Sequence, residues 1–403
     1  MARSASSLSP RHSRTRKLPD QPALAKTPDP SVTESSTAAD PAVERARSLG
    51  CLLGGAVGDA LGAAVTHDPL AEIHRRFGPA GLRDYAPAHG GLGRLTDHTQ
   101  MTLFTAEGLI RTMVASVVQG EADVLAGVGR ALLRWYHTQT EYSALTREAD
   151  LAGWLFPQRA LHTRRSSAPT CMEVLRNTRQ LDTPAENHSK DCGALTRSAP
   201  VGLLAHSAIL SRDPADTFDL GVSIARLTHG HPDGVLPAGV LTLLVLQLLG
   251  GRSLREALET ALPVLTRQFR HQPTAKALTL ALSLADSACP PAECIARLGA
   301  GWVAEEALGV AVYCALVAET FEQGVLLAVN HDGNSSATAA LTGHLLGAAL
   351  GMEAIPSRWL APLELREVIT EIAGDVYDWP QWELGNDKAT AESTQRLWEK
   401  YPG

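Results

Sequence analysis

From Pro41 onward, apolar residues recur at the three- and four-residue intervals of an α-helix, and few runs alternate with the two-residue period of a strand. Gly and Pro interrupt this pattern at intervals and so divide it into separate segments. The segments expected to be helical are 43–64, 101–118, 122–136, 199–211, 236–249, 253–266, 274–287, 303–318, 321–329 and 336–350. The pattern therefore predicts an all-α fold.

Composition divides the chain into three parts. Residues 1–40 are rich in Ser, Arg, Pro and Thr and contain few large apolar residues, so they cannot bury enough surface to offset the entropy of ordering. We expect a disordered tail there. Residues 41–377 should form one layered helical domain, and residues 378–403, with their Trp and Pro residues, a peripheral or irregular C-terminal segment.

Charge and hydropathy argue against several classes of partner. The net charge is -7, whereas a protein that binds nucleic acid directly needs a basic face. The apolar run 235–249 is shorter than a membrane span and contains Gln247, so membrane binding is not expected. The six cysteines are scattered without a CxxC pair, and no secretory leader is recognisable. We therefore expect a cytoplasmic protein with reduced thiols.

Glycine recurs every fourth residue at Gly50, Gly54, Gly58 and Gly62. On a helix these positions lie on one face, where another backbone can approach closely. Tight helix packing explains the spacing. It does not explain Asp59 in the same segment, because a buried carboxylate needs hydrogen-bond partners or a cation.

Two further segments place polar residues at the start of an apolar helix. Thr96 and Asp97 follow a Gly-rich loop, and residues 330–338 pass through a Gly-containing turn around Asn334. Either segment can simply cap its helix. Alternatively, the oxygens of the first can coordinate a hard cation, and the free N–H groups of the second can bind a ligand.

These segments, in this order, resemble the ADP-ribosylglycohydrolases. That family includes dinitrogenase reductase-activating glycohydrolase and hydrolases of ADP-ribosylarginine and ADP-ribosylserine. The likeness runs from about Gly50 to Val376. It also includes Lys190-x-Cys192-Gly193-x-x-x-Arg197-x-Ala199-Pro200, Thr228-His229-Gly230-His231-Pro232, Trp302-x-Ala304-Glu305-Glu306, Asn330-His331-x-Gly333 and Ile355-Pro356-x-x-Trp359. The resemblance implies an orthogonal multi-helix bundle in which two Mg²⁺ ions bind the ribose that carries the scissile bond.

The metal-binding positions of the family are largely changed in this chain. Thr96 and Asp97 are retained. Neutral residues stand at the positions of the other ligands: His98 for a second Asp, Asn334 and Ser336 for two Asp, Ala337 for Ser or Thr, and Thr66 for the Glu of many members. Since two dications need several carboxylates between them, we expect a degenerate magnesium site, no tightly bound cofactor and no identifiable catalytic residue.

The ADP-ribose pocket looks better preserved. The resemblance implies that backbone groups at Gly193 and Ala194 contact the distal part of ADP-ribose and that His229 lies beside it. A glycine permits close approach of the backbone to a phosphate or a ribose. Arg197 is expected either to pair with the diphosphate or to form a buried ion pair with Glu305 or Glu306.

Two functional interpretations follow, and the sequence leaves enzymatic activity open. The first is a catalytically deficient homologue that binds ADP-ribose or an ADP-ribosylated macromolecule. The second is an active hydrolase that cleaves an N- or O-glycosidic bond with a single or altered metal, in which Asp332 replaces a lost carboxylate and His98 favours Zn²⁺ or Mn²⁺.

Overall fold

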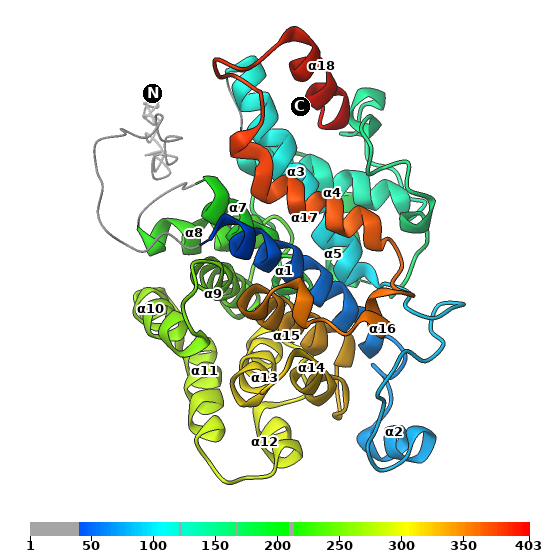
Figure 1. Ribbon diagram of the computed structural model, residues 1–403, viewed down its shortest axis with the longest axis vertical. Coiled ribbons are helices and arrows are strands. Elements are labelled where there is room, and N and C mark those ends of the chain that lie inside the picture. The colour runs from blue at the N-terminus through cyan, green and yellow to red at the C-terminus, as the bar shows by residue number, and fades with distance from the viewer. Residues whose placement is uncertain (1–39, 121–122, 167, 209–212) are drawn as a thin grey trace, which may run out of the picture. The chain divides into compact units, whose positions relative to one another are not determined.

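The structure is a computed structural model that describes residues 40–120, 123–166, 168–208 and 213–403. Within these ranges the chain forms α-helices and short 3-10 helices with two isolated β-bridges and no strand, arranged as the bundle in Figure 1. The predicted all-α class is confirmed. The predicted tail, apart from Asp40, and the predicted helical positions 122 and 209–211 lie outside the described residues.

Each long helix expected from the apolar spacing is present. These helices are α1 (Pro41–Gly62), α3 (Asp97–Gln119), α4 (Val124–Thr138), α7 (Ala199–Ala208), α9 (Pro232–Leu249), α10 (Leu254–Thr266), α11 (Gln272–Ala285), α13 (Ala304–Val317), α14 (Phe321–Val329) and α15 (Ser335–Leu350).

Among the described residues, the sequence analysis missed eight α-helices, and six of these have ten residues or fewer. They are α2 (Leu70–Phe77), α5 (Pro169–Asn177), α6 (Gly193–Thr196), α8 (Pro214–Ala225), α12 (Pro291–Leu298), α16 (Ser357–Leu360), α17 (Arg366–Asp378) and α18 (Ala391–Lys400). In α2, for example, Ile73 is the one buried residue.

Helices α1 and α15 lie antiparallel in direct backbone contact. A Cβ added at Gly50, Gly54 or Gly58 would overlap a backbone carbonyl of α15, and one at Gly62 would overlap Ser335. Glycine in α15 does the same in return, since a Cβ at Gly343 would overlap the carbonyl of Gly54. The four-residue glycine spacing therefore allows tight helix packing, as the sequence analysis predicted.

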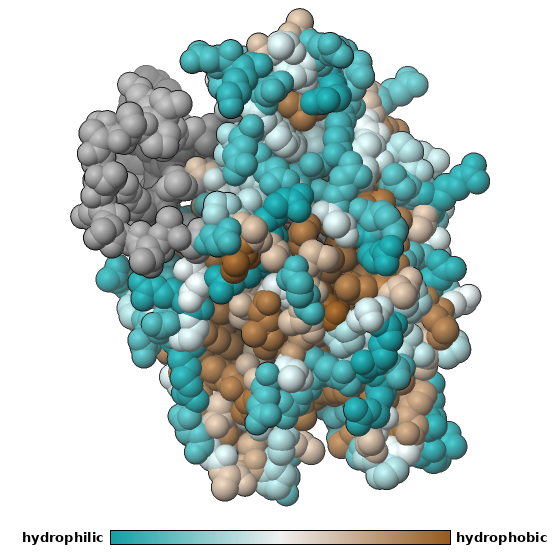
Figure 2. Space-filling view, in the orientation of Figure 1, coloured by the Kyte–Doolittle hydropathy of each residue, from teal (hydrophilic) through white to brown (hydrophobic). Residues whose placement is uncertain are grey.

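Helices α7, α8, α10 and α13 pack around α9, and α4 packs along α3. By length and composition, α3 and α9 are the two helices among the described residues apolar enough to cross a membrane, but 83% of each apolar window is buried inside the protein. In the view of Figure 2, apolar residues gather over the middle of this face, where Figure 1 places α1 and α15.

The segment after Asp378 is more ordered than the sequence suggested. It contains α18, and Tyr401 beyond this helix is fully buried, with its ring stacked on Trp382 and its edge contacting Trp154. The Tyr401 hydroxyl donates to Asp375 of α17. Residues 391–400 are therefore helical and not irregular, and paired aromatic rings dock the segment onto the bundle. Its assignment as a separate peripheral segment stays a prediction.

Candidate functional site

The antiparallel pairing of α1 and α15 brings three helix ends together. The C-terminal end of α1 meets the N-terminus of α15 at Gly62 and Ser335, and Asp59 of α1 contacts the N-terminus of α3. The candidate metal-binding positions at Thr96 and Asn334 therefore lie at neighbouring helix starts.

Asp59 is fully buried, and its carboxylate accepts four hydrogen bonds from the start of α3. Thr96 donates its N–H at 2.9 Å and its hydroxyl at 2.6 Å, and Thr99 donates its N–H at 3.3 Å and its hydroxyl at 2.6 Å. These donors include two of the N–H groups that a helix start leaves unpaired. Asp59 thus has the partners that its burial requires, all of them within the protein.

Asp97, the first residue of α3, is buried, and its Oδ1 has no hydrogen-bond partner among the described residues. Burial raises the pKa of this carboxyl, and the negative charge of nearby Asp59 raises it further. Thr96, the other retained position, is the N-cap of α3 and accepts from the His98 N–H at 3.2 Å. Asp97 is the carboxylate in this group that remains suited to a cation.

His98, which the sequence analysis predicted to replace a metal-binding carboxylate, is hydrogen-bonded within the protein. Its Nδ1 lies 3.1 Å from the Thr196 hydroxyl, and its side chain is almost fully buried. The imidazole thereby links the start of α3 to the end of α6.

At the start of α15, the neutral residues form hydrogen bonds with one another. The Oδ1 of Asn334, the N-cap, accepts from the Ala337 N–H at 3.3 Å and from the Ser336 hydroxyl at 3.2 Å. Its amide donates to the sulfur of Cys192 at 3.3 Å. Thr66, at the position of the family's Glu, accepts from the Ser336 N–H at 3.1 Å and donates to the Gly62 carbonyl. These groups therefore cap the helix.

Asp332 does not turn toward this centre, contrary to its suggested role as a replacement ligand. It is exposed, and its Oδ1 accepts from the N–H of Leu70 at 2.6 Å, at the start of α2. Within the described ranges, no three His, Cys, Asp or Glu side chains come together in a group that could hold a metal ion.

The residues expected to bind ADP-ribose lie around a carboxylate that the sequence analysis missed. The Oδ1 of Asp191 accepts from the Gly193 N–H at 2.9 Å and lies 2.7 Å from Nε2 of His229. Its Oδ2 accepts from the hydroxyls of Ser189, at 2.7 Å, and Thr170. Burial opposes ionisation of Asp191, but the hydrogen bonds from His229 and Thr170 outweigh it and hold the pKa well below its usual range.

His229 is fully buried, and both of its ring nitrogens have protein partners. Nδ1 lies 2.9 Å from the Thr228 hydroxyl, and Nε2 lies beside Asp191. Ala194 is fully buried as well. The structure therefore brings His229, Gly193 and Ala194 together, and the contact that joins His229 to Gly193 is Asp191. In the sequence, the sign that could have identified Asp191 was its position between Lys190 and Cys192 of a family motif.

The ion pair expected for Arg197 does not form. Arg197 is fully buried and donates from Nη2 to the Thr228 hydroxyl at 2.7 Å, while its Nε and Nη1 have no partner among the described residues. Glu306 instead accepts from the N–H groups of Ala300 and Gly301, and Oε2 of Glu305 is also unpartnered. Burial lowers the pKa of the Arg197 guanidinium.

Residues 299–304 join the two parts of the site. Asn334 donates its N–H to the Ala300 carbonyl at 2.8 Å, Ala304 donates to the Lys190 carbonyl at 2.8 Å, and Val303 forms an isolated bridge with Asp191. This loop therefore connects the helix starts at Asp97 and Asn334 to the loop that carries Gly193.

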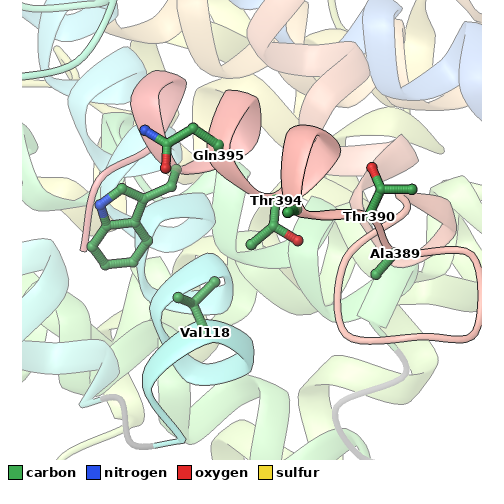
Figure 3. A pocket seen from close by; sticks show the side chains of 7 residues that line it. Val118, Ala389, Thr390, Thr394 and Gln395 are labelled. Atoms are coloured by element: carbon green, nitrogen blue, oxygen red, sulfur yellow. The ribbon is translucent and has the colours of Figure 1, made fainter.

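A separate cavity of about 580 Å³ lies at the other end of α3. Figure 3 shows it between Val118 of α3 and Thr394 and Gln395 of α18, with Ala389 and Thr390 from the preceding loop. A 23-residue helix separates Val118 from Asp97 by about 30 Å at 1.5 Å per residue. This cavity is therefore distinct from the candidate site.

The helical bundle has the fold of the ADP-ribosylglycohydrolases. The ADP-ribosylglycohydrolase family model matches residues 40–384, so the chain belongs to this family. A solved structure titled as an ADP-ribosylglycohydrolase-related protein complex is 27% identical, with a TM-score of 0.58, and the match covers 83% of this chain and 98% of that one.

Two curated relatives also have the names of ADP-ribosyl hydrolases. The chain is 28% identical to the ADP-ribosyl-[dinitrogen reductase] glycohydrolase of Rhodospirillum rubrum, over 79% of this chain and 91% of that protein. It is 23% identical to the ADP-ribosylarginine hydrolase Tri1 of Serratia proteamaculans (strain 568), over 82% of this chain and 79% of that protein. The match therefore extends over most of the domain in each case.

Proposed function

We propose that this protein is a catalytically deficient ADP-ribosylglycohydrolase homologue that binds ADP-ribose or an ADP-ribosylated macromolecule without cleaving it. One observation carries the proposal. At the N-terminus of α15, where the family holds metal through carboxylates, Asn334, Ser336 and Ala337 bond to one another as a helix cap.

The residues present do not fit a pair of Mg²⁺ ions. Two dications a few Å apart repel each other, and each carboxylate missing at about 4 Å forfeits roughly 8 kcal/mol of attraction to a dication at an effective dielectric constant of about 20. Asp97 is one carboxylate with a free oxygen, and the oxygens of Asp59 are already occupied by Thr96 and Thr99. No step of a metal-assisted hydrolysis is therefore derived for this chain.

Binding of ADP-ribose is supported by the second half of the site. Asp191 holds the loop at Gly193 against His229, so the backbone that would contact the ligand is already ordered. Relatives over most of the domain have names that specify ADP-ribosylated substrates. A preorganised backbone lowers the entropy cost of binding. We propose a cytoplasmic protein whose ligand is ADP-ribose or a modified macromolecule, without membrane or direct nucleic-acid binding.

Asp97 supports a second candidate function, an active hydrolase with a single or altered metal. Its buried Oδ1 lacks a partner among the described residues, and the charge of a cation would counteract the effect of burial that raises its pKa. The imidazole of His98 would favour Zn²⁺ or Mn²⁺, although its Nδ1 is already beside Thr196.

Paired measurements separate the two candidates. We expect calorimetric titration to detect ADP-ribose binding that does not change with Mg²⁺, Mn²⁺ or Zn²⁺, and no release of ADP-ribose from modified arginine, serine or nucleic-acid substrates. Metal-stimulated release that is lost in Asp97→Asn would establish the hydrolase instead. Absence of ADP-ribose binding under all conditions would reject both.

A further inference from the structure

An exposed pair of stacked rings lies beside the candidate site. The imidazole of His67 and the indole of Trp302 are 5.7 Å apart at their centroids and 11° from parallel. Trp302 is 45% exposed, although tryptophan is usually well buried. Exposed, well-positioned tryptophans are over-represented among the residues that carry binding energy at interfaces.

Both rings are carried by segments fastened to the first turn of α15. Thr66, next to His67, accepts from the Ser336 N–H, and Ala300, two residues before Trp302, accepts from the Asn334 N–H. Glu306 also holds the N–H groups of Ala300 and Gly301. The ring pair is therefore fixed to the helix start at Asn334, at the edge of the candidate site.

A carboxylate lies on a segment next to those that carry the rings. Asp332 is exposed, and its Oδ1 accepts from the N–H of Leu70, three residues after His67, while the following residue, Gly333, lies against Ala300. Within the described ranges Asp332 makes no ion pair, and Arg76 of α2 is paired with Asp68. An indole face with a carboxylate beside it suits a cation, which gains both cation–π and Coulomb attraction.

We propose that Trp302, His67 and Asp332 form a subsite for a lysine or arginine side chain that flanks the modified residue of an ADP-ribosylated polypeptide. This inference rests on the proposed function and names the kind of partner that the site takes. His67 fixes the orientation of the indole by stacking on it. Trp302 provides the aromatic face that the cation contacts, and Asp332 provides the negative charge that attracts it.

The test compares three ligands: free ADP-ribose and two fluorescent peptides with one ADP-ribosylated serine, flanked by lysines or by alanines. The wild-type protein should bind the lysine peptide ~3- to 10-fold more tightly than the alanine peptide. Trp302→Ala should remove this preference, and Asp332→Asn should reduce it, while the affinity for free ADP-ribose stays unchanged. His67→Phe, which keeps a stacking ring, should retain the preference that His67→Ala weakens. Val118→Ala, an exposed apolar truncation at the far end of α3, is the matched control.

The possible failures are distinct. Equal affinity of the wild-type protein for the two peptides, with ADP-ribose still bound, overturns the subsite and leaves the proposed function standing. Weaker binding of free ADP-ribose by Trp302→Ala also overturns it, because the indole would then contact the nucleotide. A wild-type protein that binds none of the three ligands rejects the proposed function and, with it, the subsite.

Discussion

At the scale of single residues, neutral and charged side chains of the site are satisfied by neighbouring protein groups. The carboxylate of Asp59 accepts hydrogen bonds from the start of α3, and the amide oxygen of Asn334 accepts from the first turn of α15. Asp191 contacts both Gly193 and His229. The exceptions among the described residues include Asp97, whose buried Oδ1 has no partner, and Arg197, whose Nε and Nη1 have none. A buried polar atom without a hydrogen bond costs stability.

Asp59→Asn should destabilise the protein by about 3 kcal/mol, because an amide cannot accept all four hydrogen bonds. Its NH₂ group would replace either Oδ1, which accepts from the Thr96 hydroxyl, or Oδ2, which accepts from the Thr99 hydroxyl and from two N–H groups. Urea unfolding at neutral pH measures this difference. Asp123→Asn is the control, since Asp123 caps α4 and asparagine is an equally good N-cap. Equal stabilities of the two variants would contradict the role given to Asp59.

Restoring the lost ligands tests the electrostatic argument directly. A chain with His98→Asp, Asn334→Asp, Ser336→Asp and Thr66→Glu should be less stable without metal, because four carboxylates repel, and should gain several degrees in its unfolding midpoint when Mg²⁺ is added. The wild-type midpoint should not respond. Thermal unfolding and calorimetry with and without Mg²⁺ measure the change, and a repaired chain that stays indifferent to Mg²⁺ would show that the donors alone do not explain the loss.

At the scale of elements, the pairing of α1 with α15 determines where the site forms. Direct backbone contact along the glycine stripe sets the register of the two helices, and that register puts the end of α1 beside the start of α15. Apolar periodicity was enough to predict the long helices, since each buries a continuous face. Short amphipathic helices such as α2 and α12 were missed because a turn or two of helix gives too few apolar positions to reveal the period.

Gly58→Ala should cost ~3 kcal/mol, since its methyl group would overlap the Ala339 carbonyl and neither helix can yield without moving its neighbours. Gly250→Ala is the matched control. Gly250 has a φ of -71° and its nearest neighbour would lie 3.5 Å from the new Cβ, so the change should be nearly neutral. Chemical unfolding distinguishes them. A neutral Gly58→Ala would mean that the helices are not in backbone contact.

At the scale of the whole molecule, the core holds two neutral histidines whose titration links stability to pH. Burial lowers the pKa of His331 and of His344 to about 4, and each imidazole has a protein partner, the Thr338 hydroxyl or the Cys51 carbonyl. The unfolded chain, with a histidine pKa of about 6.5, binds protons first as the pH falls. The contribution of these two histidines to the free energy of unfolding is therefore fully present above pH 6.5 and decreases as the pH falls toward 4.

Each histidine should contribute about 3 kcal/mol to this loss, from a shift of roughly 2.5 pKa units at 1.36 kcal/mol per unit. His344→Gln should keep a donor to Cys51 and flatten the profile between pH 6.5 and 4 by that amount. Urea unfolding at several pH values, compared between the two proteins, measures the difference in slope. Parallel profiles would indicate that His344 titrates normally in the folded state.

The order of residues along the chain was sufficient to determine the helical class and the family, because these depend on local spacing and on which side chain occupies a position. Tertiary structure decided what the side chains at the predicted site positions contact. The cap at Asn334 is local, within three residues of the chain. Contacts between segments far apart in sequence join Asp332 to α2, Arg197 to Thr228 and Asp191 to His229. Such contacts are set by how whole helices pack, and no local pattern encodes them.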